Sequence, residues 1–290
     1  MTEGFLNILK PPGMSSHDVI SVARRVLGIK KIGHAGTLDP GAAGVLPVAV
    51  GRAARLVEYL SDADKSYRAE LTLGMATDSG DDMGQVIERC ADFALPTAEQ
   101  LETVLQSFVG EIVQVPPAYS AIKINGQRAC DLARQNIAVE IPERRIRIHR
   151  IELLAQRENV LLLDVDCSKG TYIRTLCADI GTKLGIPATM SFLVRTRVGD
   201  FSLADACTLE ELAARGSAAL LPAEEYLSHL ATYTLADHRV KSFLNGLETQ
   251  DRSLPWNEDQ LLRVYGQGRF LGIGRFTADS RIVRPEKVFY

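Results

Sequence analysis

The spacing of apolar residues along the chain predicts short helices and short strands in mixed order. At three places the apolar residues fall on one face of a helix and are followed by a glycine, the usual residue just past a helix C-terminus. Elsewhere polarity alternates with the period of a half-buried strand, and one such strand puts Tyr67 on its apolar face with Ala69 and Leu71. The predicted helices cover about residues 16–28, 97–110 and 172–184, and the predicted strands about 67–73, 146–148 and 161–165.

Polar residues mark the starts of these helices. Ser16 and Asp18 can cap and charge the start of the first, and Thr97 with Gln100 forms a capping box for the second. Arg174 falls in the first turn of the third helix, where a positive charge is unfavourable to the helix dipole. Two interpretations of Arg174 stay open. It is either an exposed contact to a phosphate or carboxylate, or it lies beside a partner carboxylate that offsets the penalty.

The order of these elements indicates an α+β fold, because strands and helices are interspersed without regular βαβ alternation. After about residue 232 the pattern changes to strands joined by a Gly-Gln-Gly turn at 266–268. A β unit of about 55 residues is near the lower size limit of a domain, so packing against the rest of the chain would supply part of its burial. We predict two domains, residues 1–230 and residues 231–290.

Composition sets weaker limits on function. Of the 290 residues 46% are hydrophobic and 24% charged, which is ordinary for a globular protein. The five cysteines include no CxxC pair, so we expect reduced thiols rather than disulfides or zinc ligands. No apolar run is long enough to span a bilayer, and the first residues contain no basic and apolar leader. We expect a cytoplasmic protein with no membrane association.

The distribution of charge is more informative than the net charge of −3, which is unusual for a nucleic-acid binder. Between residues 78 and 102, seven acidic residues accompany Arg89 alone, whereas between 123 and 150 seven basic residues accompany three acidic ones. Solvated surface would explain both segments. The alternative is that the basic segment, Lys123, Arg128, Arg134, Arg144, Arg145, Arg147 and Arg150, contacts a nucleic-acid backbone.

The most specific signal is a glycine-rich stretch, GHAGTLDPGAAGVLPV, at residues 33–48. Its single carboxylate, Asp39, precedes a proline that disfavours the helical conformation and fixes the turn. The stretch lacks the Lys-Ser/Thr ending of a P-loop and the spacing of a dinucleotide fingerprint. One interpretation of Asp39 is an Asx-turn, in which the carboxylate accepts from nearby backbone amides. The other is a carboxylate presented for chemistry.

This stretch closely resembles the catalytic motif of the TruB family of tRNA pseudouridine synthases, in which the aspartate of GHxGTLDPxAxGVLPV is catalytic. Further family motifs follow in order, so the resemblance covers most of residues 5–230. They are KPPGMSS at 10–16, KSYR at 65–68, PPAYSAIK at 116–123, SKGTYIR at 168–174 and LVRT at 193–196. The chain departs from the pattern at Cys130, where a tyrosine is common. The resemblance implies a pseudouridine synthase catalytic domain with a mixed, largely antiparallel sheet flanked by helices, and a small C-terminal PUA-like β-barrel, as in bacterial members.

The resemblance also implies the chemistry. A pseudouridine synthase breaks the bond from N1 to C1′ of a uridine, turns the detached base and rejoins it through C5. Asp39 would supply the carboxylate, either as a nucleophile or by taking a sugar proton on a glycal route. Arg174 would pair with Asp39 and keep it ionised in a pocket that excludes water. Tyr67 would stack on the flipped uracil near C5, although an ordinary core tyrosine is the alternative.

Other matched residues are expected to bind the substrate or support the pocket: His34, Lys10, Tyr172 and Leu193. The resemblance implies no cofactor and no metal. It implies that the enzyme flips the uridine at position 55 of the tRNA T-loop, gripping the RNA with an insertion at about residues 110–150. We expect a monomer that needs neither guide RNA nor a protein partner.

Two alternatives from other classes remain at this point. A glycoside hydrolase would also stabilise an electron-deficient sugar, but it generally needs two flanking carboxylates and only Asp39 matches here. A non-catalytic RNA-binding module would use the basic segment and the C-terminal β unit, although Asp39, Tyr67 and Arg174 occurring together weigh against that as the sole role. Within the fold, guide-dependent archaeal and eukaryotic relatives are the nearest competitor.

Overall fold

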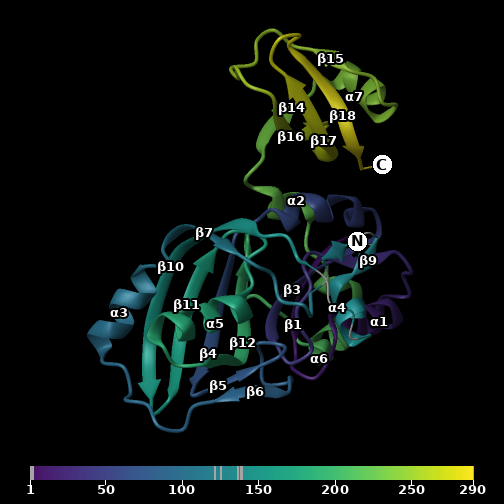
Figure 1. Cartoon of the computed structure of the whole chain (residues 1–290). Coiled ribbons are helices and arrows are strands. Elements are labelled where there is room, and N and C mark those ends of the chain that lie inside the picture. The colour runs from purple at the N-terminus through teal and green to yellow at the C-terminus, as the bar shows by residue number, and fades with distance from the viewer. Residues whose placement is uncertain (1–2, 121, 125, 136, 138–139, 290) are drawn as a thin grey trace.

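The computed structural model of the chain describes residues 3–120, 122–124, 126–135, 137 and 140–289. Up to residue 230 it consists of one large sheet with helices on it and two separate two-stranded sheets, and the remainder forms a five-stranded sheet with one helix (Figure 1). The strands before residue 110 are β1 (Gly4–Lys10), β2 (Ile32–His34), β3 (Ala43–Val50), β4 (Lys65–Leu73), β5 (Met75–Thr77) and β6 (Val86–Arg89). Those from 110 to 202 are β7 (Gly110–Gln114), β8 (Lys123–Ile124), β9 (Gln127–Arg128), β10 (Arg144–Arg157), β11 (Val160–Cys167), β12 (Ala188–Val198) and β13 (Phe201–Ser202).

The helices before residue 230 are short. They are α1 (Ser16–Leu27), α2 (Val57–Ser61), α3 (Ala98–Gln106), α4 (Ala129–Arg134), α5 (Ile173–Leu184) and α6 (Leu209–Arg215), with 3-10 turns at Gly51–Leu56, Gly216–Ala219 and Ala223–Leu227. Within the described ranges none of the helices has the length and apolar character needed to cross a membrane.

The large sheet has the strand order β1-β3-β12-β4-β11-β10-β7, with β2 paired to β3 and β13 to β12. Among the described residues, every pairing in it is antiparallel except that of β3 with β12. The parallel pair aligns Arg195 with Gly44. Gly44 has φ +113°, and a Cβ there would lie 2.2 Å from the Arg195 carbonyl oxygen, so only glycine fits. The predicted α+β class with a mixed, largely antiparallel sheet is confirmed.

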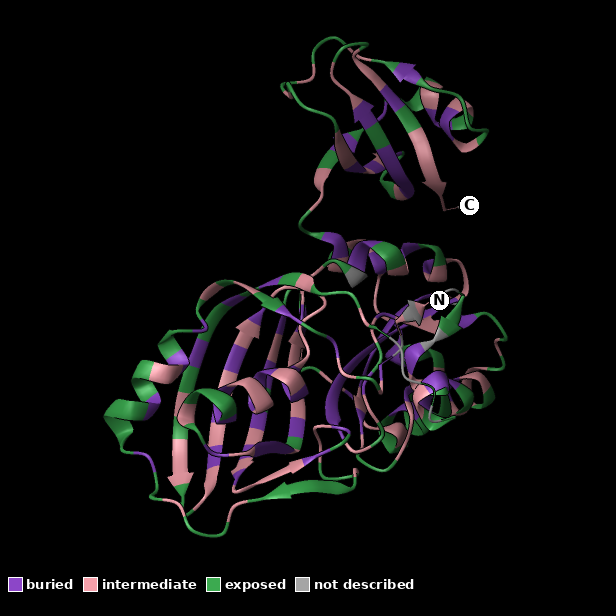
Figure 2. Ribbon diagram, viewed as in Figure 1, coloured by how far each residue is buried: buried purple, intermediate pink, exposed green. Residues whose placement is uncertain are grey.

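Helices cover the two halves of this sheet separately. α3 and α5 pack on β4, β10, β11 and β12, and the buried residues of this layer include Tyr67, Leu105, Ile148 and Leu176. α1 packs with α6 against β1 and β3 through Val19, Ile20 and Leu212. The alternation of buried and more exposed residues along the central strands follows from this one-sided cover (Figure 2).

One predicted N-cap and one predicted helix end are wrong. Ser15, not Ser16, is the N-cap of α1, in a capping box with Asp18, because the Ser16 side chain is used elsewhere. α3 ends at Gln106, and Gly110 begins β7 rather than ending the helix. The Thr97–Gln100 capping box is confirmed, as is the helix from Ile173 that ends at a left-handed Gly185.

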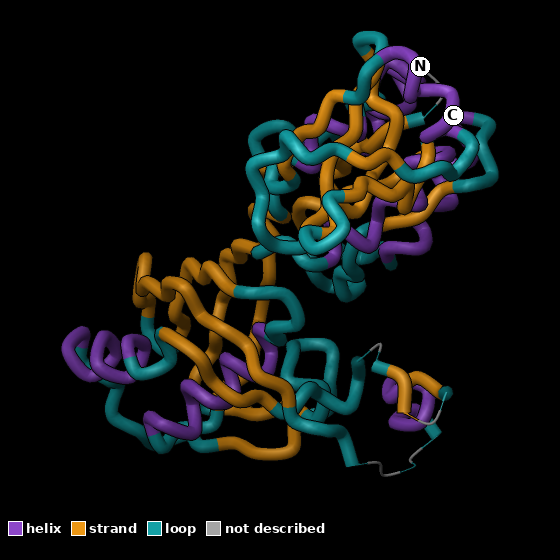
Figure 3. The backbone as a smooth tube through the Cα atoms, turned by 90° about the horizontal axis from the view of Figure 1, so that it is seen from above, coloured by secondary structure: helices purple, strands orange, loops and turns teal. Residues whose placement is uncertain are grey.

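The predicted insertion at about 110–150 begins with β7 and ends in β10, and between them the β8–β9 hairpin and α4 form a small unit beside the sheet (Figure 3). Ala121 and the side chains of Lys123 and Arg128 lie outside the described residues. Arg145 is exposed, and Arg147 forms an exposed ion pair with Glu111 at 3.5 Å.

The C-terminal strands form an open five-stranded sheet in the order β14-β16-β17-β18-β15, which is compatible with a PUA-like domain. Its elements are β14 (Ala231–Thr234), α7 (Asp237–Leu244), β15 (Thr249–Gln250), β16 (Gln260–Gly266), β17 (Arg269–Thr277) and β18 (Ile282–Val288). Ile273 packs into an apolar cluster with Phe5 and Leu56, and Tyr59 donates a hydrogen bond to Glu286 at 3.2 Å. The two predicted domains therefore share an apolar contact, and their boundary at residue 230 stays a prediction.

Candidate active site

The loop that joins β2 to β3, residues 35–42, carries Asp39 and is anchored to α1. The Ser16 hydroxyl accepts from the Leu38 backbone amide at 2.9 Å and donates to the Leu38 carbonyl at 3.1 Å. Both residues are buried. This reciprocal pair fixes the residue before Asp39, and it explains why Ser15 caps the helix instead.

Lys10 anchors the far end of the same loop. It is fully buried at the end of β1, and its Nζ donates to the carbonyl oxygens of Pro40 at 3.2 Å, Ala42 at 2.7 Å and Pro11 at 2.8 Å. Burial lowers the pKa of Lys10 to about 8. The side chain therefore supports the loop through two of its carbonyls, and the predicted role of Lys10 toward the substrate stays a prediction.

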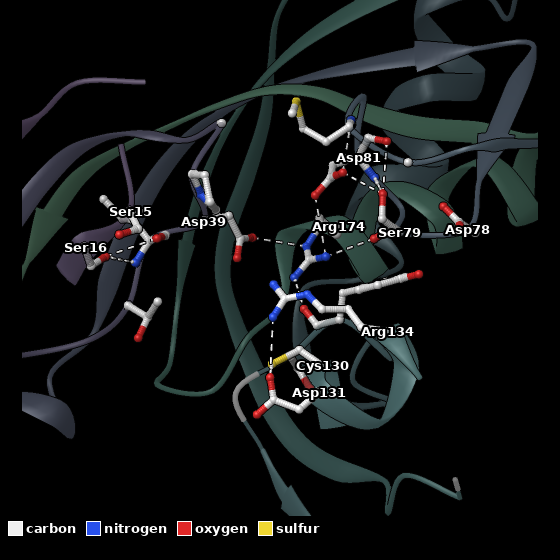
Figure 4. A pocket seen from close by; sticks show the side chains of 18 of the residues that line it. Ser15, Ser16, Asp39, Asp78, Ser79, Asp81, Cys130, Asp131, Arg134 and Arg174 are labelled. Atoms are coloured by element: carbon white, nitrogen blue, oxygen red, sulfur yellow. Dashed lines mark hydrogen bonds and ion pairs between the residues drawn. The ribbon is translucent and has the colours of Figure 1, made fainter. Parts of the chain in front are cut away.

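Asp39, Arg174 and Asp81 form one ionic group (Figure 4). Arg174 Nε lies 3.2 Å from Asp39 Oδ2, and its Nη1 lies 3.5 Å from Asp81 Oδ2. The guanidinium also donates to the carbonyl oxygens of Ser79 at 3.0 Å and Tyr119 at 2.8 Å. The Arg174 side chain is only 6% exposed, so the exposed-contact interpretation is wrong, and the neighbouring carboxylates offset the helix-dipole penalty.

The charge state of Asp39 is set by opposing effects. Burial raises the pKa of Asp39 above its ordinary value, Arg174 lowers it and Asp81 raises it. The side chain is nonetheless 40% exposed, so water also stabilises the carboxylate. In the described part of the chain no backbone amide donates to the Asp39 side chain, so the Asx-turn interpretation is wrong.

Asp39 opens into a cavity of about 310 Å³, near the lower end for ligand pockets. Four other predicted site residues line it: Tyr67, Arg174, Tyr172 and Leu193. Tyr67 and Leu193 come from the neighbouring strands β4 and β12, and Tyr172 precedes α5. Burial raises the pKa of Tyr67 to about 12, so its phenol is neutral at physiological pH.

A second, larger cavity of about 740 Å³ adjoins the first, because Asp39 and Arg174 line both. Its walls are the start of α1, the turn between β5 and β6, and α4. His34 lines this cavity rather than the smaller one, and burial lowers its pKa. Its buried Nδ1 has no hydrogen-bond partner among the described residues. Asp39 thus lies where the smaller cavity, called the chamber below, meets the larger one, called the groove. Figure 4 shows Asp39 and Arg174 among the residues that line the groove.

The structure therefore brings Asp39, Tyr67, Arg174, Tyr172 and Leu193 into one chamber, with His34 in the adjoining groove and Lys10 behind the loop. Their roles in the reaction stay predictions. Sequence reasoning assigned no role to Asp81, which lay in an acidic run that solvated surface would explain. Arg195 was assigned no role either, although it lies in the LVRT motif at 193–196.

No group of three or more His, Cys, Asp or Glu side chains among the described residues is arranged to hold a metal ion. The prediction that the reaction needs no cofactor remains a matter for experiment.

The sequence matches three family models in succession. Residues 24–173 match the model described as TruB family pseudouridylate synthase (N terminal domain). The chain belongs to the TruB family. Residues 174–231 match the tRNA pseudouridylate synthase B C-terminal domain, and residues 232–289 match the C-terminal model of pseudouridine synthase II TruB. The expected family is confirmed, and with it an RNA-modifying isomerase.

Curated relatives match over nearly the whole chain. The tRNA pseudouridine synthase B of Heliobacterium mobile is 46% identical over 99% of this chain and 94% of its own length. That of Caldanaerobacter subterraneus is 44% identical over 99% of both chains. These identities establish a TruB family enzyme rather than a glycoside hydrolase or a binding module.

Solved structures with this fold include the chain in a structure titled a Cbf5-Nop10-Gar1 complex, with a TM-score of 0.78 and 28% identity. The match covers 99% of this chain and 85% of the chain in that complex. A chain from an H/ACA RNP bound to a substrate RNA containing 2′-deoxyuridine matches with a TM-score of 0.76 and 26% identity, over 99% of this chain and 85% of its own. The predicted pseudouridine synthase fold is confirmed by these likenesses.

Proposed function

We propose that this enzyme converts uridine to pseudouridine in tRNA, at position 55 of the T-loop, with Asp39 as the catalytic carboxylate. The observation that carries the proposal is the contact of Asp39 with the buried Arg174, 3.2 Å apart, at the mouth of a chamber that also holds Tyr67. The names of the bacterial relatives support tRNA as the substrate. The T-loop position follows from the family resemblance of the motifs.

In the proposed reaction the bond from N1 to C1′ breaks, and the uracil leaves with the electron pair as an anion. Asp39 acts at the sugar, either by attacking C1′ or by taking the C2′ proton on a glycal route. The base then turns and C5 bonds to C1′, which breaks the bond from Asp39 to C1′ on the first route or takes back the C2′ proton from Asp39 on the second. The C5 proton passes to a base or to water, and N1 takes up a proton, so that the product is an isomer of the substrate. Arg174 keeps Asp39 charged when the bound RNA covers the 40% of this side chain that is exposed.

Tyr67 takes part as a neutral phenol, because its pKa is about 12. Its ring, on the wall shared with Leu193, supplies a flat apolar surface for the flipped uracil. Tyr172 closes the same chamber from the start of α5. His34 lines the adjoining groove, where it would occupy the space left by the flipped nucleotide.

The rest of the chain would hold the tRNA. We assign the grip on the T-arm to the insertion at about 110–150, whose α4 faces the start of α1 across the larger cavity. The region after residue 230 would add an RNA-binding PUA-like domain. The enzyme would act in the cytoplasm as a monomer, without guide RNA, protein partner, cofactor or metal.

The test is to incubate the purified protein alone with an unmodified tRNA transcript and assay for pseudouridine at position 55. The matched control is the same transcript with cytidine at 55, and a parallel reaction contains EDTA. We expect conversion of the first transcript in both buffers and none of the second. Product only after a guide RNA or partner protein is added would contradict the proposal, as would loss on chelation that a specific metal restores.

A further inference from the structure

Arg195 is a buried cation beside the active site. It lies on β12 and is only 1% exposed. Its Nε donates to the carbonyl oxygen of Val45 on β3 at 2.8 Å, and its two terminal nitrogens donate to the carbonyls of Gly36 at 3.1 Å and Thr37 at 3.4 Å. One guanidinium therefore joins the entry of the Asp39 loop to the first residues of the strand that follows it.

These bonds complete a set of three anchors along the loop. Ser16 holds Leu38 and Lys10 holds Pro40 and Ala42, while Arg195 holds Gly36 and Thr37 near the start. The planar fork of arginine can reach three carbonyls at once, which a lysine ammonium on a flexible stem matches poorly. Arg195 is therefore suited to fixing the backbone that leads into the catalytic carboxylate.

The charge of Arg195 is not balanced locally. Among the described residues no carboxylate lies within ion-pair distance of it, although its side chain hydrogen-bonds the Tyr67 hydroxyl. A buried cation without a carboxylate partner normally destabilises a protein. Its positive charge is felt by Asp39 and Tyr67, whose pKa values it lowers against the effect of burial. Arg195 lies on the wall of the 310 Å³ cavity, so its positive charge is in position to stabilise an anion there.

We propose that Arg195 is a positioning residue for the reaction, which fixes the Asp39 loop and places an uncompensated positive charge beside the chamber where the uracil anion forms. The second part rests on the proposed function. The first part concerns the free enzyme and stands on the hydrogen bonds alone.

The test compares two substitutions at one site. Arg195→Lys keeps the charge but loses the fork, whereas Arg195→Gln loses both. A displacement of the carboxylate by about 1 Å costs about a hundredfold in rate. We therefore expect the single-turnover rate to fall roughly ten- to hundredfold in Arg195→Lys and further in Arg195→Gln, with tRNA affinity within about twofold of wild type, because the side chain is buried.

The pH profile separates the two roles. In Arg195→Gln the acid limb of the rate should move to higher pH, because a cation that lowers the Asp39 pKa is gone. In Arg195→Lys the limb should stay in place while the rate falls. The matched control is Arg197→Lys on the same strand, whose Nε bonds Ser66 Oγ at 3.0 Å and which makes no contact to the loop among the described residues. It should keep the wild-type rate.

Amide hydrogen exchange of residues 36–42 in the free proteins tests the positioning role without any activity. We expect at least tenfold faster exchange in Arg195→Lys than in Arg197→Lys. An Arg195→Lys protein with the wild-type rate and wild-type exchange would overturn the proposal. Failure of both Arg195 variants to fold at any temperature would also overturn it, because Arg195 would then be purely structural. A wild-type protein that forms no pseudouridine would instead contradict the proposed function, and the exchange result would still decide the positioning role.

Discussion

Removing the charge of Arg174 should move the acid limb of the reaction to higher pH. The Arg174→Gln substitution leaves Asp39 close to Asp81 with no cation between them, while the carbonyls of Ser79 and Tyr119 lose their donor. Arg174 lowers the Asp39 pKa and Asp81 raises it. In the proposed reaction the ionised carboxylate is the active form, so the rate falls as the pH drops through the Asp39 pKa, and raising that pKa extends the loss toward neutral pH.

The size of the shift follows from the 3.2 Å separation of Nε and Oδ2. Two unit charges at this distance attract by about 5 kcal/mol at an effective dielectric of 20 and by about 1 kcal/mol in water. Asp39 is 40% exposed, so solvent screening reduces the upper figure to about 3 kcal/mol. At 1.36 kcal/mol for each pKa unit, the Asp39 pKa should rise by about one to two units.

The assay is the single-turnover release of tritium from C5-labelled uridine in tRNA, measured across pH with saturating enzyme. Asp81→Asn is the paired variant, because it removes the charge that raises the Asp39 pKa and should move the acid limb to lower pH. The opposite directions distinguish electrostatics from general damage to the site. Coincident acid limbs for wild type and Arg174→Gln would refute the reasoning that Arg174 keeps Asp39 charged.

Three further outcomes are expected. Asp39→Asn should abolish pseudouridine formation while thermal stability and tRNA affinity stay near wild type. A folded variant with turnover near the wild-type rate would contradict the proposed role of Asp39. Ending the chain after Leu230 should weaken tRNA binding more than the single-turnover rate, and a folded truncation that binds normally but does not react would contradict the domain assignment. Changing Arg144, Arg145 and Arg147 together to Gln should flatten the dependence of the logarithm of the tRNA binding constant on log salt. The slope should fall by about 0.7 to 0.9 for each phosphate that the variant no longer binds, and an unchanged slope would show that these arginines are solvated surface.

Elements with a local signal could be predicted from the sequence. α5 was predicted because its apolar stripe, closing glycine and length all agree, and β4 because its polarity alternates without interruption. The end of α3 could not be predicted, because Phe108 continues the helical spacing of apolar residues although the helix ends at Gln106. The N-cap of α1 depended on a tertiary contact, since Ser16 bonds Leu38 across the loop.

The candidate site divides in the same way. Asp39, Tyr67 and Arg174 stand in motifs specific enough to be found without a structure, and the structure brings them to one cavity. Asp81 could not be assigned from the sequence, because an acidic residue in a charged run resembles solvated surface. Only the fold shows that the turn between β5 and β6 places Asp81 beside Arg174. Arg195 could not be assigned from the sequence, because the spacing of a strand does not reveal that its neighbour β3 is parallel and leads out of the Asp39 loop.

The need for such anchors follows from the loop's own composition. A stretch rich in glycine has few side chains to pack and loses more backbone entropy on ordering than other sequences do. A carboxylate on it would sample many positions, whereas catalysis needs one. Ser16, Lys10 and Arg195 each bind backbone carbonyls of the loop, so they fix the path of the chain whatever side chains the loop carries. The loop can therefore stay small, because its rigidity comes from three buried side chains on α1, β1 and β12 rather than from its own packing.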